Sequence, residues 1–93
     1  MKLINEEKHK SVITTKFVIR DKSPIVYVSY DEDGDWQLFG TEEITTDDVA
    51  VVSVSQILAF CPALAKLPNM EQGTAVYREN ENSEWILQEQ DTL

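Results

Sequence analysis

The segment from Pro24 to Gly40 constrains the fold more than any other part of the chain. Two apolar runs, rich in β-branched and aromatic residues, flank a short acidic segment that contains Asp33-Gly34. An Asp-Gly pair between two such runs predicts a β-hairpin, because glycine readily adopts the positive φ that a tight turn requires. The remaining chain must then supply strands that extend this hairpin and side chains that cover one of its faces.

The register of the hairpin follows from the side chains that each alternative brings together. A two-residue loop at positions 33–34 places Glu32 opposite Asp35, and like charges directly opposite destabilise a strand pair. A three-residue loop at positions 32–34, with Gly34 left-handed, aligns apolar residues instead, so we predict this second register. The aligned pairs are Tyr30 with Trp36, Val28 with Leu38, and Tyr27 with Phe39. The resulting apolar face consists of Val26, Val28, Tyr30, Trp36 and Leu38.

The residues before the hairpin allow two interpretations. Residues 11–20 contain two β-branched pairs, which favour a strand, but Thr15 is also placed to cap a helical turn over residues 16–19. The sequence leaves both readings open. A turn follows at residues 21–24, because Pro24 fixes its own φ and disfavours a helical conformation for Ser23.

A helical segment is predicted after the strand-like run Val49–Val52. That run is apolar on both alternating faces, which suits a central strand covered from both sides or a strand that leads directly under a helix. Ser53 and Gln56 have the spacing of a capping box, and an apolar stripe follows at helical spacing. The stripe consists of Val54, Ile57, Leu58 and Cys61. Pro62 fits the first residue of a second turn and Pro68 ends it, so we predict one kinked helix or two short helices.

The elements together predict an α+β fold. With further strands at residues 74–78 and 85–88, we expect a mostly antiparallel sheet of about five strands with the helical segment packed on one face. A length of 93 residues indicates one domain, since chains usually divide at roughly 100 to 200 residues per domain. We assign the domain to residues 11–93 and treat residues 1–10 as a polar N-terminal extension, either frayed or a short appended turn.

The charge of the chain indicates what kind of partner it binds. Seventeen acidic and eight basic residues give a formal net charge of -9, and no Lys or Arg occurs between Ser23 and Ala65. Such a surface repels nucleic acid and anionic membranes and attracts a basic protein, although acidity also serves solubility alone. We predict that a basic partner binds eight acids of this interval: Asp31, Glu32, Asp33, Asp35, Glu42, Glu43, Asp47 and Asp48.

Four of these acids also match the ligand spacing of a calcium-binding loop. Asp31, Asp33, Asp35 and Glu42 occupy its positions one, three, five and twelve. The loop needs glycine at position six for a sharp bend, whereas this chain has Trp36 there, and the flanking segments are predicted strands rather than helices. We therefore predict no metal site and no cofactor, and keep a small-ligand-binding or divalent-cation-binding domain as an alternative function.

Catalytic residues are not evident in the sequence. The only histidine, His9, lies in the polar lead-in, and the only cysteine, Cys61, belongs to an apolar helix stripe where free cysteine packs as a small hydrophobe. We therefore predict that the chain is not an enzyme. A single cysteine cannot form an intrachain disulfide, and the chain has neither a signal-peptide core nor an apolar run of ~20 residues, so we expect a cytoplasmic protein.

Several short motifs occur in an informative order. They are Lys16-Phe17-Val18, Pro24-Ile25-Val26, Asp35-Trp36-Gln37-Leu38-Phe39-Gly40, Val51-Val52-Ser53-Val54 with Ile57-Leu58, Pro62-Ala63-Leu64, and Gly73-Thr74-Ala75-Val76-Tyr77-Arg78. Over residues 11–87 this order resembles a family of small bacterial immunity proteins of polymorphic toxin systems, family thirty-three, first described as a domain of unknown function. The chain departs from the family pattern at Cys61, where a helix-capping Asp would precede the proline.

The resemblance implies a small α+β fold that binds and neutralises a cognate toxin and carries no catalytic residues. This function agrees with the basic partner that the charge predicts. A structural domain that self-associates through a sheet edge, as a homodimer, is the third alternative.

Overall fold

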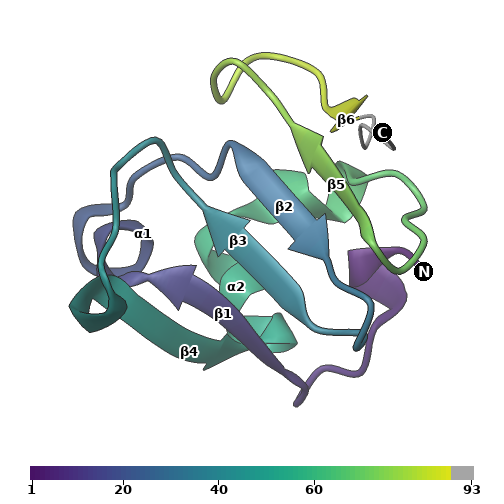
Figure 1. The fold of residues 1–93 in the computed structure, drawn as a ribbon, viewed down its shortest axis with the longest axis horizontal. Coiled ribbons are helices and arrows are strands. Elements are labelled where there is room, and N and C mark those ends of the chain that lie inside the picture. Colours follow the sequence, from purple (N-terminus) through teal and green to yellow (C-terminus); the bar gives the residue numbers. More distant parts are fainter. Residues whose placement is uncertain (89–93) are drawn as a thin grey trace.

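The strands of the structure form one six-stranded sheet. The structure is a computed structural model and describes residues 1–88. Its strands are β1 (Ser11–Thr15), β2 (Tyr27–Tyr30), β3 (Trp36–Phe39), β4 (Val49–Ser53), β5 (Thr74–Tyr77) and β6 (Ile86–Gln88). Its helices are α1 (Lys16–Asp21) and α2 (Val54–Phe60), with 3₁₀ turns at Leu3–Asn5, Thr46–Asp48 and Pro62–Lys66. The strand order is β4-β1-β3-β2-β5-β6 (Figure 1).

The sheet confirms the predicted α+β class. β1 and β3 pair in parallel, and the other neighbouring strands pair antiparallel. The sheet therefore has six strands rather than about five and is mostly antiparallel, as predicted. In Figure 1, α2 lies behind the sheet and no helix lies over the near face. None of the helices within residues 1–88 is long and apolar enough to cross a membrane.

The hairpin between β2 and β3 has the predicted register. Tyr30 pairs with Trp36, and the N–H of Asp31 donates to the carbonyl of Asp35 over 2.9 Å. Gly34 has a φ of +83°, so the loop turns through the left-handed glycine that the sequence predicts. The rings of Tyr30 and Trp36 stack with their centroids 4.2 Å apart, and Trp36 is fully buried. This pair places the hairpin over the middle of the core.

Residues 11–21 contain both structures that the sequence left open, a strand and then a short helix. β1 ends at Thr15, and α1 begins directly after it. The hydroxyl of Thr15 accepts a hydrogen bond from the N–H of Val18 over 3.3 Å, which is the predicted cap. α1 then ends at Lys22, whose left-handed backbone lets its N–H donate to the carbonyl of Phe17.

β4 is an edge strand, so the alternative of a central strand covered from both sides is wrong. Val51 remains 64% exposed because β4 has only one neighbour and its outer face is uncovered. The second alternative, a strand that leads directly under a helix, is closer to the structure, because β4 leads directly into α2. The capping box of Ser53 and Gln56 is formed as predicted. Pro62 opens a separate 3₁₀ turn, so the helical segment consists of two short pieces.

The N-terminal segment forms the short turn that was one of its two predicted forms, and it also joins the core. Leu3 is fully buried. The amino group of Met1 donates to the carbonyl of Met70 over 2.9 Å. The indole N–H of Trp36 donates to Glu6 over 3.1 Å. The lead-in therefore connects the hairpin to the segment before β5.

We predict that Leu3→Ala lowers the free energy of unfolding by about 2–5 kcal/mol, because it leaves a cavity in a packed core. Ile4→Ala is the matched control, since Ile4 is 42% exposed and surface substitutions usually change stability by less than about 0.5 kcal/mol. Urea denaturation followed by tryptophan fluorescence measures both. Equal stability of the two variants would mean that the lead-in is not part of the core.

The contact between Glu6 and Trp36 predicts a pH dependence. Partial burial raises the pKa of Glu6, but the hydrogen bonds from Trp36 and from the N–H of Glu7, with the charge of Lys10, outweigh burial and hold the pKa below its ordinary value. The folded protein thus gains stability above the unfolded pKa of about 4.3 and loses it as the pH falls through the lower folded pKa.

We therefore expect Glu6→Gln to destabilise the protein at neutral pH, by an amount that shrinks as the pH falls below about 4.3. Urea denaturation across this pH range measures the difference. Glu7→Gln, at the exposed neighbouring position, should follow the wild type throughout. A Glu6→Gln curve parallel to the wild type would contradict the role of this carboxylate.

Candidate partner-binding surface

The structure separates the eight predicted acids into two groups at opposite ends of β3. The first group lies in the turn between β2 and β3, which we call the hairpin tip (residues 31–35). The second group lies in the connection from β3 to β4 (residues 40–48). Figure 1 shows these two segments at different edges of the molecule. The acids thus form two surfaces rather than one.

At the hairpin tip, one acid shapes the turn and the others face solvent. A carboxylate oxygen of Asp31 accepts the backbone N–H groups of Asp33 and Asp35, each over 2.9 Å. Glu32, Asp33 and Asp35 are exposed. Within residues 1–88, no hydrogen bond or ion pair engages the carboxylates of Asp33 and Asp35. These carboxylates are therefore available to a partner.

The calcium-loop spacing does not produce a converging set of four ligands. Carboxylate oxygens of Asp31, Asp33 and Asp35 lie within 4.8 Å of one another. Glu42, the fourth residue of that spacing, lies beyond the other end of β3. One oxygen of Asp31 is already occupied by two backbone N–H groups. The three carboxylates lie close together because Asp31 binds the backbone of Asp33 and Asp35 in the turn.

In the second group, two of the four acids stabilise the fold. Glu42 accepts a hydrogen bond from the hydroxyl of Ser23 over 2.6 Å. Its other oxygen is buried against Gly40, where a Cβ would lie only 2.7 Å from it. A side chain at position 40 would therefore displace the carboxylate of Glu42 and would also lie 3.0 Å from the carbonyl of Pro24.

Asp48 is held by its own loop and by α1. Its carboxylate accepts the N–H of Thr45 over 2.9 Å and pairs with Lys16 over 3.0 Å. The hydrogen bond from Thr45 and the charge of Lys16 hold the pKa of Asp48 below its ordinary value. Only Glu43 and Asp47 of this group are exposed.

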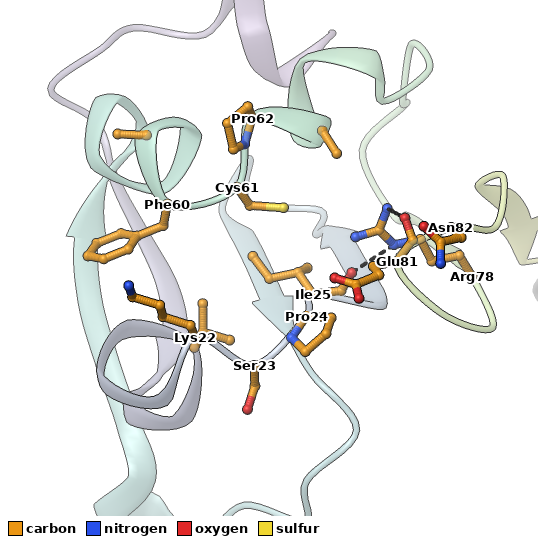
Figure 2. Close-up of a pocket in the computed structure, with 13 residues that line it drawn as sticks. Lys22, Ser23, Pro24, Ile25, Phe60, Cys61, Pro62, Arg78, Glu81 and Asn82 are labelled. Carbon is orange, nitrogen blue, oxygen red and sulfur yellow. Dashed lines mark hydrogen bonds between the residues drawn. The ribbon is translucent and has the colours of Figure 1, made fainter.

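A groove of about 600 Å³ lies elsewhere, between the end of α1, the end of α2 and the connection from β5 to β6 (Figure 2). Apolar residues, among them Ile25, Phe60 and Pro62, line much of it. Cys61 and Arg78 also line it, and Figure 2 shows the sulfur of Cys61 directed toward the side where Arg78 lies. His9 is exposed and is not one of the lining residues, so the thiol has no histidine beside it in the groove.

Arg78 is a structural residue that is bound by backbone carbonyls and an aromatic ring rather than by a carboxylate. Its side chain is buried, and the ion pairs within residues 1–88 do not include it. Its Nε donates to the carbonyl of Ile25 over 2.9 Å, and Nη1 donates to the carbonyl of Glu81 over 3.3 Å. The guanidinium lies 4.4 Å from the ring centroid of Trp85. Arg78 thus ties the end of β5 to the start of β2 and to the β5–β6 connection.

One face of the sheet, which we call the open face, is not covered by a helix and was not predicted from the sequence. Its side chains are those that alternate with the core residues of each strand. Its apolar members are Ile13, Tyr27, Phe39, Val49, Val51, Tyr77 and Ile86. The alternation was visible in the sequence, but which side a helix leaves uncovered was not.

Comparison with known protein families, with curated proteins and with solved structures finds no match to this chain. The fold and the surfaces define a small acidic α+β domain with one helix-covered and one open sheet face.

Arg78 generates a prediction about stability. Arg78→Leu leaves the carbonyls of Ile25 and Glu81 without their partner, and each unsatisfied buried group costs about 1–3 kcal/mol. We expect a loss of about 2–3 kcal/mol in the free energy of unfolding, measured by urea denaturation. Arg20→Leu removes an exposed arginine paired with the adjacent Asp21 and should change stability far less. Equal losses in both variants would contradict the bridging role of Arg78.

Proposed function

We propose that this chain is a non-enzymatic module that binds a basic protein, as an immunity-type protein that neutralises a bacterial toxin in the cytoplasm. The observation that carries the proposal is the set of exposed, unpaired carboxylates at the hairpin tip. The resemblance to the immunity family supplies the toxin as the kind of partner.

The distribution of ion pairs supports this proposal. Within residues 1–88 the pairs join Lys10 to Glu6, Lys16 to Asp48, and Arg20 to Asp21. None of these cations neutralises Glu32, Asp33 or Asp35. The tip acids therefore add to the negative field of a chain whose formal net charge is -9, and such a field accelerates encounter with a basic protein.

The residues that line the groove do not favour a catalytic function. It combines apolar side chains with a thiol, and its buried cation Arg78 is engaged by two backbone carbonyls and an aromatic ring. A nucleophilic cysteine needs a base or another group that lowers its pKa. The groove holds no histidine for this purpose.

Charge reversal at the hairpin tip tests the proposal. The probe is the protein that the wild-type chain captures from its native host, identified by mass spectrometry and then purified. We expect Asp33→Lys with Asp35→Lys to weaken its binding by about 10- to 100-fold at low salt, measured by calorimetry, with a smaller difference at high salt because screening reduces the contribution of exposed charges.

The matched control reverses Glu43 and Asp47 instead, two exposed acids of the second group. It changes the net charge by the same amount at the other end of β3, and we expect it to reduce affinity much less. Equal effects of the two variants would mean that net charge alone matters. Unchanged binding in the tip variant, or tight binding of Ca²⁺, Mg²⁺ or Mn²⁺ at the tip in the same calorimeter, would contradict the assignment of these acids to a protein partner.

A further inference from the structure

The open face carries large apolar side chains on the strands of the sheet, with polar side chains between some of them. Cross-strand partners lie on the same side of a sheet, so the strand pairings define its rows. The first row contains Val49, Thr15, Phe39, Tyr27, Tyr77 and Ile86 in spatial order. The second row contains Val51, Ile13, Gln37, Ser29, Ala75 and Gln88.

Large side chains of this face are exposed to solvent. Val51 is 64% exposed, Ile86 51% and Tyr77 43%. The rings of Tyr27 and Phe39 stack in parallel at the centre of the row, with their centroids 6.4 Å apart and an interplanar angle of 3°. Monomeric proteins rarely expose a contiguous apolar patch of more than a few hundred Å², and such patches mark interaction sites.

The charged residues of the open face are acidic. Neither row contains Lys or Arg. Asp31 and Asp35 follow the same alternation as Ser29 and Gln37, so both lie at the hairpin end of this face. Lys10 instead lies near Gly34 together with the hydroxyl of the buried Tyr30, which is on the core side of the hairpin. The face therefore combines an apolar centre with an acidic end.

A second copy of this chain is a poor occupant for this surface. Each copy has a formal net charge of -9, so association of two copies is opposed by repulsion. Pairing through the edge of β4 is also obstructed, because the N–H of Val49 donates to Thr46 and the N–H of Ser53 donates to Gln56 over 2.9 Å. Two of the N–H groups that an added strand would use are thus already occupied.

We propose that the open face is the docking surface for a basic protein, which places an apolar segment on the row from Phe39 to Ile86 and its Lys or Arg side chains against the hairpin tip. This inference rests on the proposed function and specifies where and by which chemistry the partner binds. Affinity then comes from the apolar side chains of the row from Phe39 to Ile86, and the tip acids contribute encounter rate and orientation.

Two triple variants test the proposal. The face variant carries Val51→Thr, Tyr77→Thr and Ile86→Thr, which keep good strand formers. The control variant carries Ile4→Thr, Phe60→Gln and Leu87→Thr, at positions that are 42%, 47% and 59% exposed but lie off the open face. Circular dichroism and urea denaturation establish that both are folded. Ile86→Thr alone replaces the face variant if the triple substitution prevents folding, because Ile86 belongs to the row from Phe39 to Ile86 and is 51% exposed.

The probe is the partner captured from the native host, purified and titrated by calorimetry. We expect the partner to be basic, the face variant to bind it about 10- to 100-fold more weakly, and the control variant to bind it as the wild type does. The remaining binding of the face variant should keep its dependence on salt, because the tip acids are intact.

The other outcomes contradict one proposal or both. Wild-type affinity in the face variant, together with weak binding of the charge-reversed tip variant, would overturn the docking surface and leave the proposed function standing. An acidic partner, or no captured partner, would overturn both. A wild-type protein that sediments as a dimer and becomes monomeric in the face variant would assign the open face to a second copy, which overturns this inference.

Discussion

The register of the β2–β3 hairpin is the constraint on which the rest of the structure depends. A shift by one residue would turn Trp36 from the core to the open face, because side chains alternate along a strand. In the observed register Trp36 is buried, stacks on Tyr30, and donates to Glu6 of the N-terminal segment. β2 and β3 are also the two central strands, so β5 pairs with one of them and β1 with the other. One tight turn therefore fixes the position of both halves of the sheet.

Features set by neighbouring residues were predictable from the sequence, and features set by distant ones were not. The left-handed Gly34, the cap at Thr15 and the capping box at Ser53 depend on residues within one turn, so their spacing identifies them. The parallel pairing of β1 with β3 and the edge position of β4 depend on packing across the whole sheet. Leu3 and Ile4 are adjacent apolar residues in an otherwise largely polar segment, so no periodicity revealed that Leu3 is the buried one.

The candidate site shows the same limit. Composition identified the acidic interval, but residue type does not say which carboxylates form hydrogen bonds or ion pairs within the fold. Glu42 and Asp48 are held by Ser23 and Lys16, both of which precede the hairpin in the sequence. The partners of Arg78 are backbone carbonyls that the fold brings to it, and residue type alone does not identify them. The long connection from β3 to β4 therefore owes its shape to some of the acids that were predicted to bind a partner.

The remaining acids and the open face complement each other physically. An uncovered apolar sheet face favours self-association, because burying it removes apolar surface from water. A formal net charge of -9 opposes that association at a distance, and the acids at the hairpin end oppose it at close range. The same charges attract a surface of opposite sign, so the negative charge disfavours a second copy and favours a basic protein. The acids at the hairpin end would thus oppose the self-association that the apolar side chains of the open face favour, and they would leave the face open to the basic partner that we propose.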